Sequence, residues 1–145
     1  MLQYLRSTNS DSIISPQENL QSGSWVRCER PSDEEVSQLL ALGLDEDLIS
    51  DALDPHEVPR IEFDDEWTYL IARLPDTDDD FNDFTTPILF CINKDHIVTL
   101  SRDSLGRLWQ PFIDKVRIRT DRQVELLVAM VEAISMQYQR RVATI

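Results

Sequence analysis

A dense cluster of carboxylates lies between residues 76 and 83, where five aspartates occur within eight positions. So many like charges repel one another unless a cation neutralises them, and carboxylate oxygens are ligands that Mg²⁺, Ca²⁺ and Mn²⁺ prefer. The cluster therefore indicates either a solvated loop or a weak site for a hard cation. In such a site the protein supplies one or two carboxylates, and a subunit interface could complete it.

The EF-hand is the first known cation site to compare with this cluster. Asp76, Asp78 and Asp80 match the first three ligand positions of an EF-hand loop. The match fails afterwards, because Phe81 stands where a glycine makes the sharp turn and Pro87 stands where a bidentate glutamate is required. The cluster is therefore not an EF-hand.

No residue set for catalysis is present in the sequence. His56 and His96 have no second histidine or cysteine at metal-ligand spacing, and there is no GxSxG motif. Three glycines are too few and too scattered to build a phosphate-binding loop. Pairs of carboxylates occur by chance in a chain with 27 acidic residues. We therefore expect no enzyme and assign no catalytic residue; a small hydrolase has no support.

The net charge of −13 excludes several partners. A surface this negative repels phosphate backbones and anionic lipid heads, so we expect no nucleic-acid binding and no peripheral membrane binding. The charge attracts cations, although it could also serve solubility alone. Cys28 and Cys91 do not form a disulfide framework, which favours a reducing cytoplasmic setting. No signal peptide and no membrane-spanning apolar stretch is recognisable.

Two helix starts are clear in the first half of the chain. Ser32 and Glu35 form a capping box for a helix that reaches Gly43. Asp45 is the N-cap of a second, short helix, which Pro55 stops because the residue before a proline resists the helical conformation.

Residues 1–5 and 11–15 are expected as the short strands of a hairpin in a poorly patterned region, and strand patterns occur at 25–28, 60–63, 67–74, 88–92 and 97–101. The last four form a meander, and Pro75 is expected to end its second strand before a polar loop over 76–86. Strands and helices in this order predict an α/β fold, an αβα sandwich with a mixed, largely antiparallel β-sheet covered by helices.

The C-terminal part predicts a helix over 105–116, which Pro111 should kink or interrupt, and a long amphipathic helix over 120–145. Thr120 and Gln123 form a capping box for the long helix. Its apolar residues recur at intervals of seven, at Val124, Val131, Tyr138 and Ile145. Because no glycine or proline ends the helix, we expect the sequence to stop inside a longer protein. Residues 1–145 are interpreted as one regulatory domain, with 1–24 a poorly patterned hairpin region.

The segment over residues 49–62 reads ISDALDPHEVPRIE and closely resembles a stretch of CorA-type magnesium/cobalt transporters. In that family a short helix ending in DALDP leads through RPR or RPK into a strand; here Val58 replaces the first arginine. Four further segments are similar to the family's succeeding strands and to the start of its stalk helix: 67–73, 87–92, 96–102 and 126–138. The likeness covers roughly residues 25–145.

The resemblance implies the cytoplasmic domain of a homopentameric divalent-cation channel at the inner face of the cell membrane. In the family, cations bound between neighbouring cytoplasmic domains hold the channel closed, and falling Mg²⁺ opens it. One carboxylate partner comes from the loop after the strand equivalent to 67–74. This alignment places the strongest metal-ligand candidates at Asp78 and Asp79, with Asp76 and Asp80 as neighbours. The family's other partner lies on the stalk beyond residue 145, as do the membrane spans and the Gly-Met-Asn pore signature.

The expected ion is Mg²⁺, with Co²⁺, Ca²⁺ or another divalent cation as alternatives, and binding by this half-site should be weak. Relatives that carry zinc share the architecture. The chain's expected partner is itself, as a pentamer in the full-length protein and as a monomer or weak dimer alone. The alternative function is a free-standing acidic interaction domain that uses its C-terminal heptad helix. A reading frame that ends at residue 145 would favour this alternative.

Overall fold

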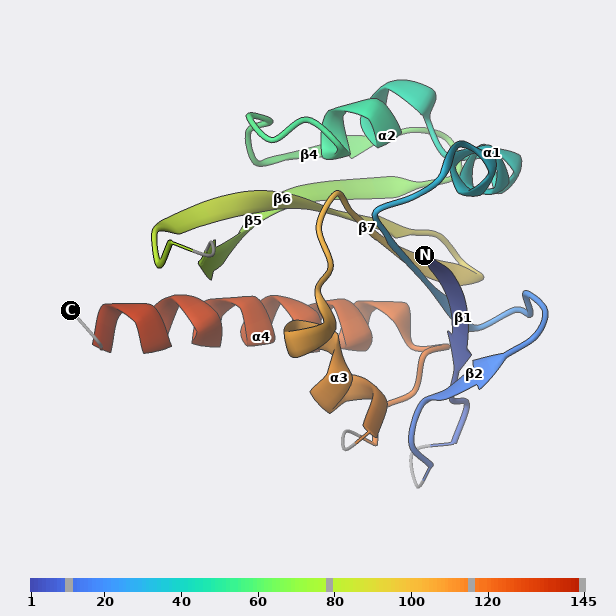
Figure 1. Cartoon of the computed structure of the whole chain (residues 1–145). Coiled ribbons are helices and arrows are strands. Elements are labelled where there is room, and N and C mark those ends of the chain that lie inside the picture. Colours follow the sequence, from blue (N-terminus) through green and yellow to red (C-terminus); the bar gives the residue numbers. More distant parts are fainter. Residues whose placement is uncertain (10–11, 78–79, 115–116, 144–145) are drawn as a thin grey trace.

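The computed structural model describes residues 1–9, 12–77, 80–114 and 117–143. Across these residues a seven-stranded sheet has the strand order β2-β1-β3-β7-β6-β5-β4 (Figure 1). Its strands are β1 (Leu2–Arg6), β2 (Ser15–Gln17), β3 (Ser24–Glu29), β4 (Arg60–Phe63), β5 (Thr68–Thr77), β6 (Asp83–Ile92) and β7 (His96–Ser101). The pairing of β3 with β7 is parallel, and the other neighbours are antiparallel.

Helices cover both faces of the sheet, as Figure 1 shows. They are α1 (Asp33–Ala41), α2 (Glu46–Ala52), α3 (Gly106–Asp114) and α4 (Gln123–Ala143). One apolar core lies between the sheet and α1 with α2, and a second lies between the sheet and α3 with α4. Trp25 and Val26 are neighbours in β3, yet each is fully buried in a different core, since successive side chains point to opposite faces. The predicted αβα sandwich is confirmed.

Both predicted helix starts in the first half of the chain are confirmed. Ser32 Oγ accepts a hydrogen bond from the Glu35 amide at 3.2 Å, and Glu35 Oε1 accepts from the Ser32 amide at 3.0 Å. Hydrogen bonds from the Ser32 amide and from the N-terminal ammonium of Met1 lower the pKa of Glu35. Asp45 Oδ1 accepts from the Leu48 amide at 3.1 Å. Short-range capping signals therefore predicted the starts of both helices correctly.

The capping box expected at Thr120 and Gln123 is wrong. Thr120 is fully buried, and its Oγ1 accepts from the Ser7 amide at 2.9 Å and donates to the Gly23 carbonyl at 2.5 Å. The Gln123 side chain donates to the carbonyl of Lys94 instead. The Thr120 hydroxyl therefore bonds to backbone groups about a hundred positions away in the sequence, and it does not cap α4 as the short-range pattern predicts.

Two strand predictions need correction in their bounds. The second N-terminal strand is β2, at residues 15–17 rather than 11–15, and residues 10 and 11 lie outside the described ranges. β5 continues through Pro75, and β6 already begins at Asp83, so the expected loop over 76–86 is much shorter. β4 pairs only with residues 68–71, so Pro75 lies where β5 has a strand on one side only and a missing N–H is tolerated.

The long C-terminal helix is confirmed, but its buried face is not the predicted heptad stripe. Leu126, Met130 and Ile134 are buried, at four-residue spacing. Val124 is 68% exposed, and Val131 is also exposed. α4 carries apolar residues on two faces, and packing against the sheet buries only one of them. Within the described residues, no helix is both long enough and apolar enough to cross a membrane.

Candidate cation-binding loop and the adjoining pocket

The long β5–β6 ribbon carries the acidic cluster at its end. The strands pair in register up to Thr77 opposite Asp83, which leaves only residues 78–82 as the connection. Asp76 therefore lies within β5, opposite Phe84, and Asp80 is exposed in the turn. The two strongest candidates, Asp78 and Asp79, lie outside the described residues. The structure brings Asp76, Asp80 and Asp83 to one end of the ribbon and leaves the placement of 78 and 79 untested.

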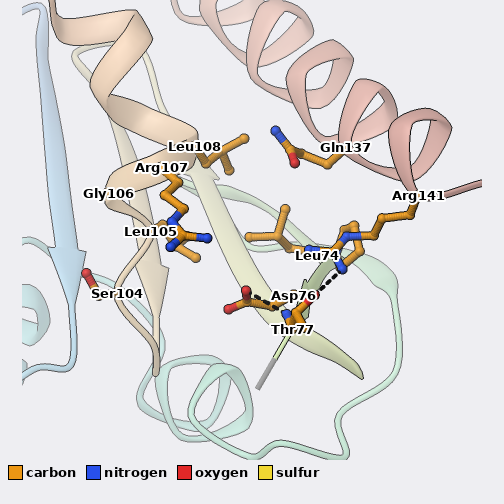
Figure 2. A pocket seen from close by; sticks show the side chains of 11 residues that line it. Leu74, Asp76, Thr77, Ser104, Leu105, Gly106, Arg107, Leu108, Gln137 and Arg141 are labelled. Carbon is orange, nitrogen blue, oxygen red and sulfur yellow. Dashed lines mark hydrogen bonds between the residues drawn. The ribbon is translucent and has the colours of Figure 1, made fainter. Parts of the chain in front are cut away.

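Hydrogen bonds and the guanidinium of Arg141 hold this end of the ribbon together. Asp76 Oδ1 accepts from the Thr77 amide at 2.8 Å, and Thr77 Oγ1 donates to Asp83 Oδ1 at 3.0 Å. Arg141, near the end of α4, donates from Nη1 to Thr77 Oγ1 at 2.5 Å and to Asp83 Oδ1 at 2.8 Å. Figure 2 shows the Arg141 side chain extending from α4 to Thr77 of β5. A protein cation therefore already neutralises part of the cluster.

Asp83 and Arg141 are the residues that the sequence reasoning missed as members of this site. Asp83 belonged to the acidic cluster but was not among the candidate ligands. Arg141 lies 58 positions away in the chain, and no local motif marks it. Only a general feature of the sequence pointed to Arg141. It is a basic residue in the last turn of a helix that follows an acidic loop in an acidic chain.

A pocket of about 420 Å³ adjoins the ribbon end. Its lining comes from the last part of β5, the start of α3 and the C-terminal part of α4 (Figure 2). Arg107 and Arg141 contribute positive charge, Asp76 contributes negative charge, and Gln137 and Ser104 contribute neutral polar groups. A lining of mixed charge suits water or a small polar solute better than an apolar ligand.

A buried ion pair holds the α3 wall of the pocket in place. Arg27 and Glu29 are 7% and 2% exposed on β3 and form a two-point ion pair, with Arg27 Nε 2.5 Å from Glu29 Oε2. Glu29 Oε1 also accepts from the Leu105 amide at 2.8 Å, immediately before α3 begins. The position of the α3 N-terminus at the pocket therefore depends on charges inside the sheet–helix core.

The segment that carried the family resemblance is a structural connector. Arg60 pairs with Asp51 at 2.5 Å and also with Glu57 and Glu62. Arg73 of β5 donates to the carbonyls of residues 55 and 57, at 2.9 and 2.7 Å. These contacts fix the loop after α2 to β5, the strand that leads into the acidic end of the ribbon. α4 is fixed to the same strand, because the Tyr138 hydroxyl donates to the Arg73 carbonyl at 2.9 Å.

The described residues alone do not assemble a complete metal centre. No group of three or more histidine, cysteine, aspartate or glutamate side chains that could hold a metal is present within the described ranges. The donors that are present are carboxylates, which fit a hard cation and not a soft one. A site here would need further ligands, from residues 78 and 79, from water or from another copy of the protein.

The conformation of Phe81 gives a first test of the loop. Phe81 has φ +64° and is 89% exposed, so a bulky residue adopts a left-handed backbone with little packing in return. Phe81→Gly is expected to raise the free energy of unfolding by about 0.5–1 kcal/mol, since the steric cost exceeds glycine's entropy cost. Urea unfolding measures the change. Phe84→Gly, in the extended backbone of β6, is the control and should destabilise instead; a loss in both variants would contradict the strain at Phe81.

The architecture defines a class of protein, an αβα domain with a mixed sheet, a long C-terminal helix and a charged strand–loop–strand end. The family described as CorA-like Mg²⁺ transporter protein has a sequence model that matches residues 21–145, and the chain belongs to this family. The predicted relationship to the N-terminal domain of CorA-type transporters is therefore confirmed.

Individual relatives agree with this assignment. The chain is 29% identical over 122 residues to the cobalt/magnesium transport protein CorA of Methanocaldococcus jannaschii, covering 80% of this chain and 38% of the relative. The soluble domain of M. jannaschii CorA matches 99% of the chain with a TM-score of 0.82 and 22% identity, over 59% of its own length. The ZntB cytoplasmic domain from Vibrio parahaemolyticus matches 98% with a TM-score of 0.71 and 14% identity, over 60% of its length. The structural matches establish the shared fold.

Proposed function

We propose that the chain is the cytoplasmic regulatory domain of a CorA-type divalent-cation transporter, and that the acidic end of the β5–β6 ribbon contributes ligands to a regulatory Mg²⁺ site. The observation that carries this proposal is the position of Asp76, Asp80 and Asp83 at one end of the ribbon, where Asp83 pairs with Arg141. Family membership supports the transport role. The carboxylate donors support a hard divalent cation.

Arg141 gives the site a link to the rest of the domain. Its guanidinium lies at hydrogen-bonding distance from Asp83 and comes from α4. A divalent cation bound by neighbouring carboxylates repels this guanidinium and competes for the same oxygens. Cation binding is therefore coupled to the last turns of α4. In the longer protein, carboxylates of adjacent copies in a homopentamer complete the site, and the cation favours the arrangement of subunits that keeps the pore closed.

Titration of the chain with Mg²⁺ tests the site directly. Amide resonances of Asp76, Asp80 and Asp83 are expected to shift in ¹H–¹⁵N NMR spectra, with a dissociation constant on the order of 1 mM. The double variant Asp78→Asn with Asp79→Asn should weaken binding about fivefold or more, because it removes two nearby carboxylate charges. Ca²⁺ and Co²⁺ titrations rank the alternative ions. Unchanged resonances across 76–83 at saturating Mg²⁺ would contradict a local contribution.

Two further variants separate a built site from general attraction of cations to an acidic chain. Asp33→Asn with Glu34→Gln removes two charges from the first turn of α1, far along the chain from the ribbon end, and should leave Mg²⁺ binding at the loop unchanged. Arg141→Gln removes the internal cation and should tighten Mg²⁺ binding about two- to fivefold. Equal effects of the α1 and loop variants would show that net charge alone attracts the ion. The parent gene tests the transport role, which requires a reading frame that continues into hydrophobic spans.

A further inference from the structure

The acidity of the chain is concentrated in one layer of the fold. Between residues 31 and 67 there are 13 of the 27 acidic residues and only one of the 14 basic residues, Arg60. This segment carries −12 of the net charge of −13. It forms α1, α2, β4 and the turn into β5, which lie together along one face and one edge of the sheet (Figure 1). The remainder of the chain is nearly neutral.

β4 is the edge strand within this acidic layer, and its outer backbone groups can be identified. The Asp64 amide donates to the Trp67 carbonyl at 3.0 Å and closes the β4–β5 hairpin. Hydrogen-bonded pairs alternate along an antiparallel ladder, so Glu62 and Arg60 direct their N–H and C=O groups toward β5. Ile61 and Phe63 must then direct theirs outward. Among the described residues, no hydrogen bond links the backbone of either residue to an element outside the sheet.

The side chains of this edge are divided between the two faces of the sheet. Ile61 is opposite Leu70, which packs against the α3/α4 core, so Ile61 and Phe63 lie on that face. They are 61% and 74% exposed. Glu62 is opposite Tyr69 of the α1/α2 core and lies on the acidic face, half exposed. The edge therefore presents apolar side chains on one face, Glu62 paired with Arg60 on the other, and outward backbone groups between them.

We propose that the β4 edge binds an extended segment of another protein in which lysine or arginine alternates with apolar residues, adding it to the sheet as a further strand. Such a segment would satisfy the outward N–H and C=O groups of Ile61 and Phe63. Its apolar residues would pack on Ile61 and Phe63, and its basic residues would share Glu62 with Arg60 and face the surrounding acidic layer. Natural sheets rarely leave an apolar edge uncovered.

Charge decides between the candidate occupants of this edge. Pairing of β4 with β4 of a second copy would bring together two layers that each carry a net charge of −12. The repulsion between these layers disfavours such a dimer. A basic segment gains from the same field, and its alternating pattern matches the two faces of the edge. The surface is separate from the acidic ribbon end, so this inference does not depend on the cation site.

The probe is a synthetic peptide of about ten residues in which lysine and valine alternate. It is longer than β4, so it can pair with the edge in more than one register. In ¹H–¹⁵N NMR titrations of the chain, the amides of Ile61 and Phe63 are expected to shift and to gain protection from solvent exchange. A peptide of the same composition with all lysines first should bind at least tenfold more weakly. Equal affinity for the two peptides would overturn strand addition and leave only charge attraction.

Variants of exposed residues test the same surface without disturbing the core. Ile61→Thr with Phe63→Thr should weaken the alternating peptide about tenfold, and Glu62→Lys with Asp65→Lys should weaken it further and flatten its salt dependence. Val124→Thr on α4, at 68% exposure, is the matched control and should leave binding unchanged. Circular dichroism confirms that each variant is folded. Concentration-dependent shifts of Ile61 and Phe63 without peptide would overturn the proposal in favour of self-pairing.

Discussion

Replacing Glu29 with leucine is expected to lower the free energy of unfolding by about 3–5 kcal/mol. The substitution leaves the Arg27 guanidinium, only 7% exposed, without its two-point partner, and it leaves the Leu105 amide without an acceptor. A buried charge without a partner is among the most costly changes in a protein core. Urea unfolding followed by circular dichroism measures the loss, and NMR shifts at the start of α3 report the freed pocket wall.

The double variant Arg27→Met with Glu29→Leu is the control for this prediction. Well-packed apolar residues often replace a buried ion pair at little cost, so the double variant should recover most of the lost stability. Glu29→Gln keeps an acceptor for the Leu105 amide but loses the charge, and it should fall between the wild type and Glu29→Leu. If the double variant were as unstable as the single one, packing at Glu29 or the unpaired Leu105 amide, and not the ion pair, would explain the loss.

The accurately predicted parts of the fold are those specified by short-range signals. The caps at Ser32 and Asp45 act within three residues, so the sequence shows them directly. The β4–β7 meander follows from tight turns and alternation, which also act locally. The parallel pairing of β3 with β7 had no such signal, because about seventy positions separate the paired residues Trp25 and Ile97.

The failures share one cause, competition from partners that are distant in the sequence. Thr120 has the right spacing to cap α4, but Ser7 and Gly23 take its hydroxyl. α4 has enough apolar residues for two stripes, and only the docked sheet determines which stripe is buried. A single sequence carries no information about which of these alternatives gains more free energy in the assembled fold.

The candidate site was predictable in composition but not in geometry. The run of aspartates identifies a place where a cation would be stabilised. It does not reveal that Asp76 belongs to a strand, that the connection is short or that Arg141 contacts Asp83. The last point changes the chemistry, because a site with its own counter-cation binds an external cation less tightly. The expectation of weak binding thus gains a physical cause within the chain.

Trp109→Ala is expected to destabilise the domain by about 3–5 kcal/mol, because it removes a large, fully buried side chain and leaves a cavity. Trp109 of α3 makes edge-to-face contacts with Trp25 at 5.4 Å, Phe112 at 5.6 Å and Phe90 at 6.5 Å between ring centroids. It therefore attaches α3 to strands β3 and β6, and its loss should also release the α3 wall of the pocket. Thermal and urea unfolding provide the stability measurement.

Phenylalanine substitutions at the two tryptophans distinguish aromatic packing from hydrogen bonding. Both rings are fully buried, but Trp25 Nε1 donates to Thr99 Oγ1 at 2.9 Å, whereas Trp109 Nε1 has no hydrogen-bond partner among the described residues. Trp25→Phe loses that bond and leaves a buried hydroxyl with one partner fewer, while Trp109→Phe removes a buried donor that was already unsatisfied. Trp25→Phe should therefore cost about 1–3 kcal/mol more than Trp109→Phe. Equal costs would show that ring volume alone governs this core, and that the Trp25–Thr99 bond contributes nothing to holding β3 against β7.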